Sequence, residues 1–175
     1  MTREIFEAEL SAEDLVPSST DDQKLLRRTF GCFPKGVAAV CAHIGNRPVG
    51  LTISSFTSVS LQPPLVSMCM MRSSRRWILL RQAERLGLSF LAREHEELSR
   101  SLASSDSDVL EGQHVTPEGA VLLPGATAWL DCSLYDELDA GDHTIALLRV
   151  HRVRARPEQA PLVFHASKFH QLVAT

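Results

Sequence analysis

The sequence has no CxxC pair, no Cys/His group at zinc-finger spacing and no run of eighteen apolar residues. Its four cysteines lie far apart, so we expect free, reduced thiols and no disulfide framework. Residues 1–30 are acidic and polar, whereas a signal peptide needs a basic start and an apolar run. We therefore expect a cytoplasmic protein that does not span a membrane.

Signatures of hydrolysis and phosphoryl transfer are also missing: there is no GxSxG, Walker loop, HExxH or GxGxxG. The formal net charge of −3 gives no reason to expect nucleic acid or an anionic membrane as a partner. The seven histidines are scattered, and none has a carboxylate or a cysteine at metal-ligand spacing. We expect no metal site.

Helical signals are few and short. Residues 1–20 show no sustained period and are expected to form a mobile N-terminal arm before a single domain over 21–175. Thr20 and Gln23 have capping-box spacing, and the apolar stripe that follows predicts a helix ending near Gly31. Two further helices are predicted over 75–82 and 94–104.

Most of the remaining pattern is typical of strands. The apolar run 37–42, the turn residues 45–48 and the run 49–53 predict a hairpin. Residues 126–135 alternate, which predicts a half-buried strand with Ala126, Ala128, Leu130, Cys132 and Leu134 on one face. Six or seven strands with two or three peripheral helices favour a mainly β, closed antiparallel barrel over a βαβ sheet. The other strands are predicted over 65–70, 86–92, 143–153 and 162–165.

One stretch stands out by its hydroxyl groups. Residues 50–64 contain many serines and threonines between a turn and Pro63-Pro64. Hydroxyls and free amides at a strand end suit the polar edge of a flavin ring or a phosphate. A Ser/Thr-rich surface connection has the same composition, so the residues alone leave both interpretations open.

Four segments occur in a characteristic order and spacing: 33–40, 50–64, 88–92 and 141–145. The most specific are the Thr-x-Ser-Ser-Phe and Ser-Leu-x-Pro-Pro block and the Gly-Asp-His block. From Leu25 to Phe169 the sequence resembles the flavin reductase-like family, the small reductase components of two-component flavin monooxygenases. The resemblance implies an FMN-binding split β-barrel that forms a homodimer.

The resemblance also implies a site for FMN or FAD. Arg75 and Arg76 fall where the family contacts flavin phosphate, and guanidinium groups match phosphate oxygens bidentately. Ser101 and Leu102 stand where many members have an Arg-Phe pair near the flavin. The positions implied to contact flavin are Pro48, Gly50, Leu51, Thr52, Ser54, Ser55, Cys69, Met70, Met71, Arg75, Arg76, Ser101 and Leu102.

A second cofactor, NADH or NADPH, is implied by the Gly-Asp-His block. His143 falls in the family's nicotinamide-binding motif, and Thr144, Ile145 and Ala146 follow it on the same strand. The family's hydride transfer joins two cofactor atoms, so no catalytic side chain is expected. Arg149 and His165 depart from the family pattern, and these departures bear on nicotinamide binding.

The resemblance thus implies an NAD(P)H:flavin oxidoreductase that supplies reduced flavin to a separate monooxygenase. Two alternatives remain. A flavin-binding carrier or assembly protein would share the flavin site but have little reductase turnover. A dimeric barrel that binds nothing redox-active would share only the fold.

Overall fold

The computed structural model describes residues 22–104, 110, 113–170 and 172. The predicted arm 1–20 and its last residue, Thr20, lie outside them. Helix α1 (Gln23–Gly31) is confirmed, but its cap differs from the prediction, because the Asp22 carboxylate accepts a hydrogen bond from the Leu25 amide at 2.9 Å. An aspartate at this position satisfies an amide that the first helical turn leaves free.

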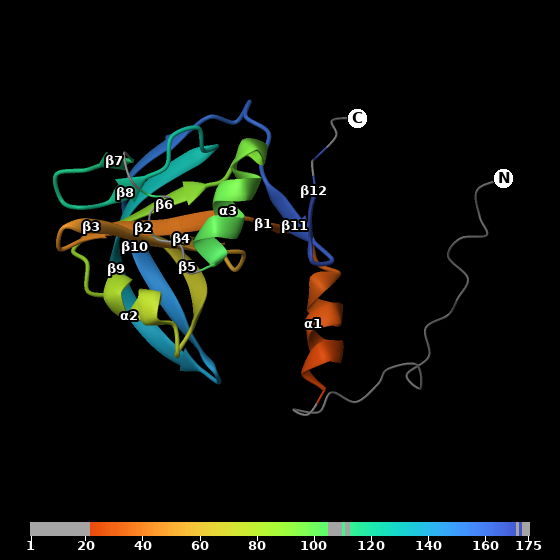
Figure 1. Cartoon of the computed structure of the whole chain (residues 1–175). Coiled ribbons are helices and arrows are strands. Elements are labelled where there is room, and N and C mark those ends of the chain that lie inside the picture. The colour runs from red at the N-terminus through yellow and green to blue at the C-terminus, as the bar shows by residue number, and fades with distance from the viewer. Residues whose placement is uncertain (1–21, 105–109, 111–112, 171, 173–175) are drawn as a thin grey trace.

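Seven strands form one antiparallel sheet in the order β3-β2-β6-β9-β10-β5-β4. The edge strands β3 and β4 are joined only by residues 54–56, a link that reaches about 14 Å, whereas a flat sheet would hold them roughly 29 Å apart. The sheet therefore curls into a barrel (Figure 1). Its strands are β2 (Ala38–Ile44), β3 (Arg47–Ile53), β4 (Thr57–Leu61), β5 (Pro64–Met71), β6 (Leu86–Phe90), β9 (Ala128–Ala140) and β10 (His143–Ala155).

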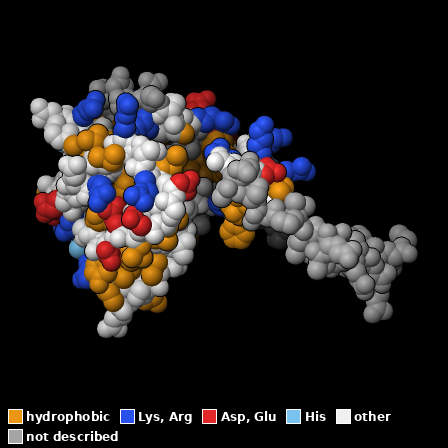
Figure 2. All heavy atoms as spheres, turned by 90° about the horizontal axis from the view of Figure 1, so that it is seen from below, with side chains coloured by type: hydrophobic (Ala, Val, Ile, Leu, Met, Phe, Trp, Pro, Cys, Tyr) orange, Lys and Arg blue, Asp and Glu red, His pale blue; other side chains and the backbone are white. Residues whose placement is uncertain are grey.

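Smaller elements surround the barrel. Helix α1 stands to one side of it beside β12, while α2 and α3 lie against the barrel (Figure 1). In the view from below, hydrophobic side chains are exposed on the barrel beside a mixed cluster of basic and acidic ones (Figure 2). No helix of the described residues is long and apolar enough to cross a bilayer. The smaller elements are β1 (Lys35–Gly36), α2 (Arg75–Leu80), η2 (Arg93–His95), α3 (Glu96–Ala103), β7 (His114–Val115), β8 (Val121–Leu122), β11 (Val163–His165) and β12 (Lys168–His170).

The barrel interior is filled by apolar side chains from alternate positions of its strands, among them Val40, Met68, Leu88 and Leu148. Because strand side chains alternate in direction, the intervening residues face outward or into neighbouring layers. A second apolar cluster, which includes Leu102 of α3, lies on the other side of β2. Burial of each large side chain contributes about 1.5–3 kcal/mol, so these clusters hold the strands and α3 together.

The predicted strands are confirmed with shifts at their ends, and the mainly β barrel class is confirmed. The patterns missed β4, which lies within the hydroxyl-rich stretch. This strand forms an edge of the sheet and pairs with β5, and its side chains stay largely exposed, including Val59 and Leu61. Most of the serines and threonines of the hydroxyl-rich stretch therefore belong to the edge strand β4 as well as to the link 54–56 before it.

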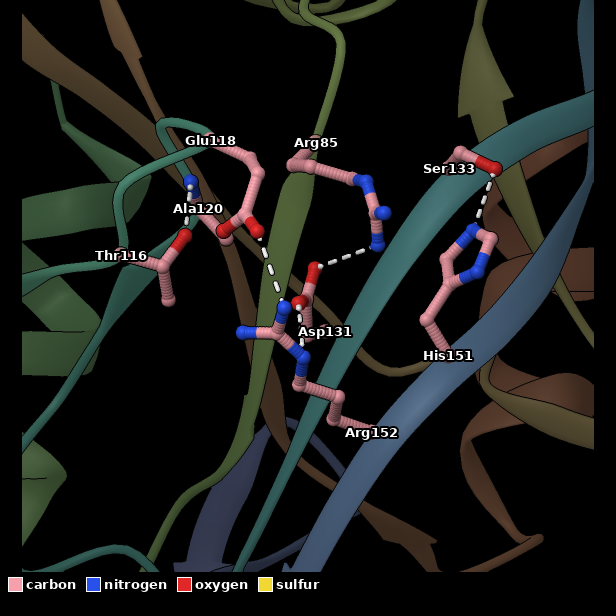
Figure 3. A network of polar contacts seen from close by, with 8 residues as sticks. All are labelled: Arg85, Thr116, Glu118, Ala120, Asp131, Ser133, His151 and Arg152. Atoms are coloured by element: carbon pink, nitrogen blue, oxygen red, sulfur yellow. Dashed lines mark hydrogen bonds and ion pairs between the residues drawn. The ribbon is translucent and has the colours of Figure 1, made fainter.

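A charged network breaks the predicted alternation of β9. Asp131 is only 3% exposed, although it lies between Leu130 and Cys132 on a strand predicted to bury the other face. Arg85 donates to Asp131 Oδ1 at 3.3 Å, and Arg152 Nε lies 3.9 Å from Oδ2 (Figure 3). Arg152 also donates to Glu118 at 2.9 Å. The carboxylate is buried because two guanidinium groups compensate it.

Candidate flavin site

A groove of about 830 Å³ opens where β3 and β5 end, beside the start of α2 and the end of α3. Hydroxyl, sulfur and guanidinium groups share its walls with aliphatic side chains. Most of the predicted flavin contacts lie there together with the predicted nicotinamide contact. The predicted residues that line the groove are Leu51, Thr52, Ser54, Ser55, Cys69, Met70, Met71, Arg75, Arg76, Leu102 and His143.

Strand pairing explains why the two sequence blocks meet. Strand β10 runs antiparallel to β5, and its first residue, His143, pairs with Met71 at the end of β5. The turn before it needs Gly141, whose φ of +64° lies in the left-handed region that glycine adopts without strain. The Arg72 amide donates to the Asp142 carbonyl at 3.1 Å and fixes the turn. The Gly-Asp-His block is thus held against the groove by backbone pairing.

Ser55 lies in the link between the edge strands β3 and β4, and its side chain bonds to β5. Its Oγ accepts from the Cys69 amide at 2.9 Å and donates to the Cys69 carbonyl at 3.2 Å. The backbone pairing of β4 with β5 reaches Thr57 and Ser67, so the Ser55 hydroxyl continues that ladder by two residues. Its proton is used by the fold, and the oxygen keeps acceptor capacity toward the groove.

Two arginines at the start of α2 differ in their surroundings. Arg76 donates to the carbonyls of Leu102 and Ser104, and thereby ties α2 to the end of α3. A cation at these carbonyls is favourable because they carry the negative end of the helix dipole. Arg75 is exposed, and among the described residues no acidic side chain lies within 4 Å of it. Arg75 is therefore the guanidinium available to a phosphate.

His143 is oriented by the residue before it. Its Nδ1 lies 2.7 Å from Asp142 Oδ1, and this hydrogen bond and the histidine's charge hold the pKa of Asp142 below its ordinary value. Donation from Nδ1 leaves Nε2 without a partner among the described residues. That nitrogen can bond to a ligand oxygen or nitrogen at the groove.

Six predicted contacts are not brought to the groove. A Cβ on Gly50 would lie 2.5 Å from Cys41 Sγ and 2.8 Å from Leu110 Cδ1, so this glycine is required by core packing. Strand alternation turns Thr144 and Ala146 into the barrel interior. Contacts from these positions remain predictions. The six are Pro48, Gly50, Ser101, Thr144, Ile145 and Ala146.

The groove also contains residues that the sequence did not indicate. Lys35 of β1 reaches it because β1 pairs with β11, a contact between segments far apart in sequence. Ser104 follows α3 and is placed by the bonds of Arg76. Ser54 borders both this groove and an apolar cavity of about 420 Å³ that includes Phe56 and Phe90. Only long-range contacts bring Lys35 and Ser104 to the groove, so no local signal could have found these two residues.

The chain is a closed antiparallel barrel with a groove at its strand ends, a place where β-barrels bind small molecules. The chain matches the family model of the flavin reductase like domain over residues 30–173 and belongs to that family. The resemblance noted from the sequence is thereby confirmed.

The chain is similar to proteins that are named for different activities. It is 34% identical over 154 residues to the actinorhodin polyketide dimerase of Streptomyces coelicolor, covering 86% of this chain and 87% of that one. It is 31% identical over 164 residues to HsaB of Rhodococcus jostii, a flavin-dependent monooxygenase reductase subunit, covering 93% and 84%. The NADH:FAD oxidoreductase SgcE6 of Streptomyces globisporus, solved with NAD and FAD fragments, superposes with a TM-score of 0.81 at 32% identity, covering 91% and 98%.

Proposed function

We propose that the chain is an NAD(P)H-dependent flavin reductase that takes FMN or FAD as a substrate and passes the reduced flavin to a separate monooxygenase. The observation that carries this is the meeting of Arg75 and His143 at one groove. A cation that can bind phosphate and a ring nitrogen that can bond a second cofactor would let one groove hold both cofactors.

The groove has a volume within the usual range of cofactor sites. Bound nicotinamide and flavin supply hydride transfer from one ring to the other. Arg75 and Lys35 bind phosphate, and His143 Nε2 fixes the nicotinamide by a hydrogen bond. The half-exposed Met71 gives an adaptable apolar wall against a flat ring. The side chains orient the cofactors, and none has to take up a proton.

The monooxygenase partner and the homodimer belong to the same proposal. The similarity to a reductase subunit favours a separate oxygenase as the acceptor. Phe30 and Phe33 are 60% and 72% exposed on and after α1, where a second copy of the chain can cover them. Light scattering during gel filtration tests the dimer. Four free thiols suit the reducing cytoplasm.

Steady-state loss of NADH and NADPH with FMN, FAD or no flavin tests the activity. We expect oxidation that depends on added flavin and saturates with it. R93A should keep the activity of the unchanged chain, since Arg93 is exposed and pairs with Glu94 away from the groove. Flavin binding without NADH or NADPH loss would indicate a carrier, and absence of flavin binding would contradict the proposal altogether.

A further inference from the structure

A second groove lies at the end of β10, whereas the flavin groove lies at its start, and the two grooves share no lining residue. Its volume is about 460 Å³. Arg154 pairs with Trp129 in the register of β10 and β9, which puts both side chains on one face, and Arg156 follows on that face. The groove's walls include His114, Leu122, Pro124, Trp129, Arg154 and Arg156.

Hydrogen bonds to backbone carbonyls fix the walls of this groove. Trp129 Nε1 donates to the Leu123 carbonyl at 2.6 Å, which fixes the indole ring. The Pro124 carbonyl lies 2.9 Å from His95 Nε2, while His95 Nδ1 accepts from a backbone amide. The Arg156 amide donates to a carbonyl before β9 at 2.7 Å. A ligand would therefore meet a preformed surface, which lowers the entropic cost of binding.

Both arginines lie against the indole. The guanidinium carbons of Arg154 and Arg156 are 5.8 Å and 5.3 Å from the Trp129 ring centroid, within the range of cation–π contacts. Among the described residues neither has an acidic side chain within 4 Å, whereas the neighbouring Arg152 pairs with Glu118 at 2.9 Å. The two guanidinium groups thus keep their N–H edges for a ligand.

We propose that this groove binds a carboxylate-rich segment of a partner protein. Guanidinium edges accept carboxylates bidentately, and tryptophan and arginine dominate the energetic centres of protein interfaces. The chain's net charge of −3 makes this cationic groove a local feature. Nucleic acid fits less well, because its binding relies on several neutralised phosphates along a track. The inference does not rest on flavin reduction.

Binding of a rhodamine-labelled decaglutamate peptide, followed by fluorescence anisotropy, tests this proposal. We expect the full chain to bind it and R154A/R156A to raise Kd by at least about ten-fold. The control R28A/R93A removes two exposed arginines elsewhere and should change Kd by less than about two-fold. R154K/R156K keeps the positive charge but cannot bind a carboxylate bidentately, and we expect an intermediate Kd.

Three results would overturn the proposal. One is equal binding of the peptide by the chain and R154A/R156A, which would mean that the arginines only shield Trp129. Another is an equal loss in R28A/R93A, which would mean unspecific attraction. The third is tighter binding of single-stranded dT10 than of decaglutamate. Thermal unfolding of each variant checks that the fold is kept.

Discussion

The flavin groove and the Asp131 network treat charged side chains in opposite ways. In the network, a carboxylate that is 3% exposed is compensated by Arg85 and Arg152, so its charges serve the fold. In the groove, Arg75 and the Nε2 atom of His143 have no such partner among the described residues. Removing one partner of a buried ion pair destabilises the fold, whereas polar groups without a partner in the chain can be satisfied by a ligand.

The largest effect should come from breaking the network. Replacing Asp131 with alanine leaves Arg85, whose side chain is 19% exposed, without its carboxylate. We expect a loss of about 3 kcal/mol in the free energy of unfolding, measured by urea denaturation, with the flavin Kd of the folded protein unchanged. The double variant R85M/D131L should recover much of the loss, because it removes both charges. A shifted flavin Kd with unchanged stability would reverse the comparison.

Next in size is the difference between Arg75 and Arg76. R75A should raise the Kd for FMN about ten-fold through loss of charge-assisted hydrogen bonds, with little change in Tm. R76A should lower Tm as well, because Arg76 holds the carbonyls of Leu102 and Ser104. Riboflavin, which lacks the phosphate, is the control ligand, and R75A should leave its Kd unchanged. Equal losses for riboflavin and FMN would show that Arg75 does not contact the phosphate.

The sequence predicted the barrel and most of the groove for different physical reasons. Runs and alternations of apolar residues report burial, so most strands could be located from the sequence pattern, although Asp131 is buried between Leu130 and Cys132. Arg75 and His143 were found through motifs. Lys35 and the bonds of Arg76 depend on which distant segments pair. Asp131 is buried because Arg152 of β10 and Arg85, which precedes β6, reach it. Local patterns carry no information on such partners.

A smaller effect is expected at His143, which contributes one hydrogen bond. H143A should raise the KM for NADH about five-fold, the size of a hydrogen bond of about 1 kcal/mol. The flavin Kd should stay within error, since flavin is bound mainly by other groups. H143N keeps a polar group of similar reach and should recover part of the loss. A fall in kcat at unchanged KM would place His143 in the chemical step and contradict a binding role.

The smallest effect is expected at Asp142, whose side chain is 88% exposed. His143 holds the pKa of this carboxyl below its ordinary value of 3.8 in the folded chain. A lowered pKa stabilises the fold at pH values above 3.8, and the contribution disappears as the pH falls through the lowered value. The Tm difference between the chain and D142N should therefore be present at about pH 5 and shrink below pH 4. D139N, at an exposed carboxylate 3.8 Å from Arg72, is the control. A difference that grows in acid would show that the pair with His143 does not favour the carboxylate.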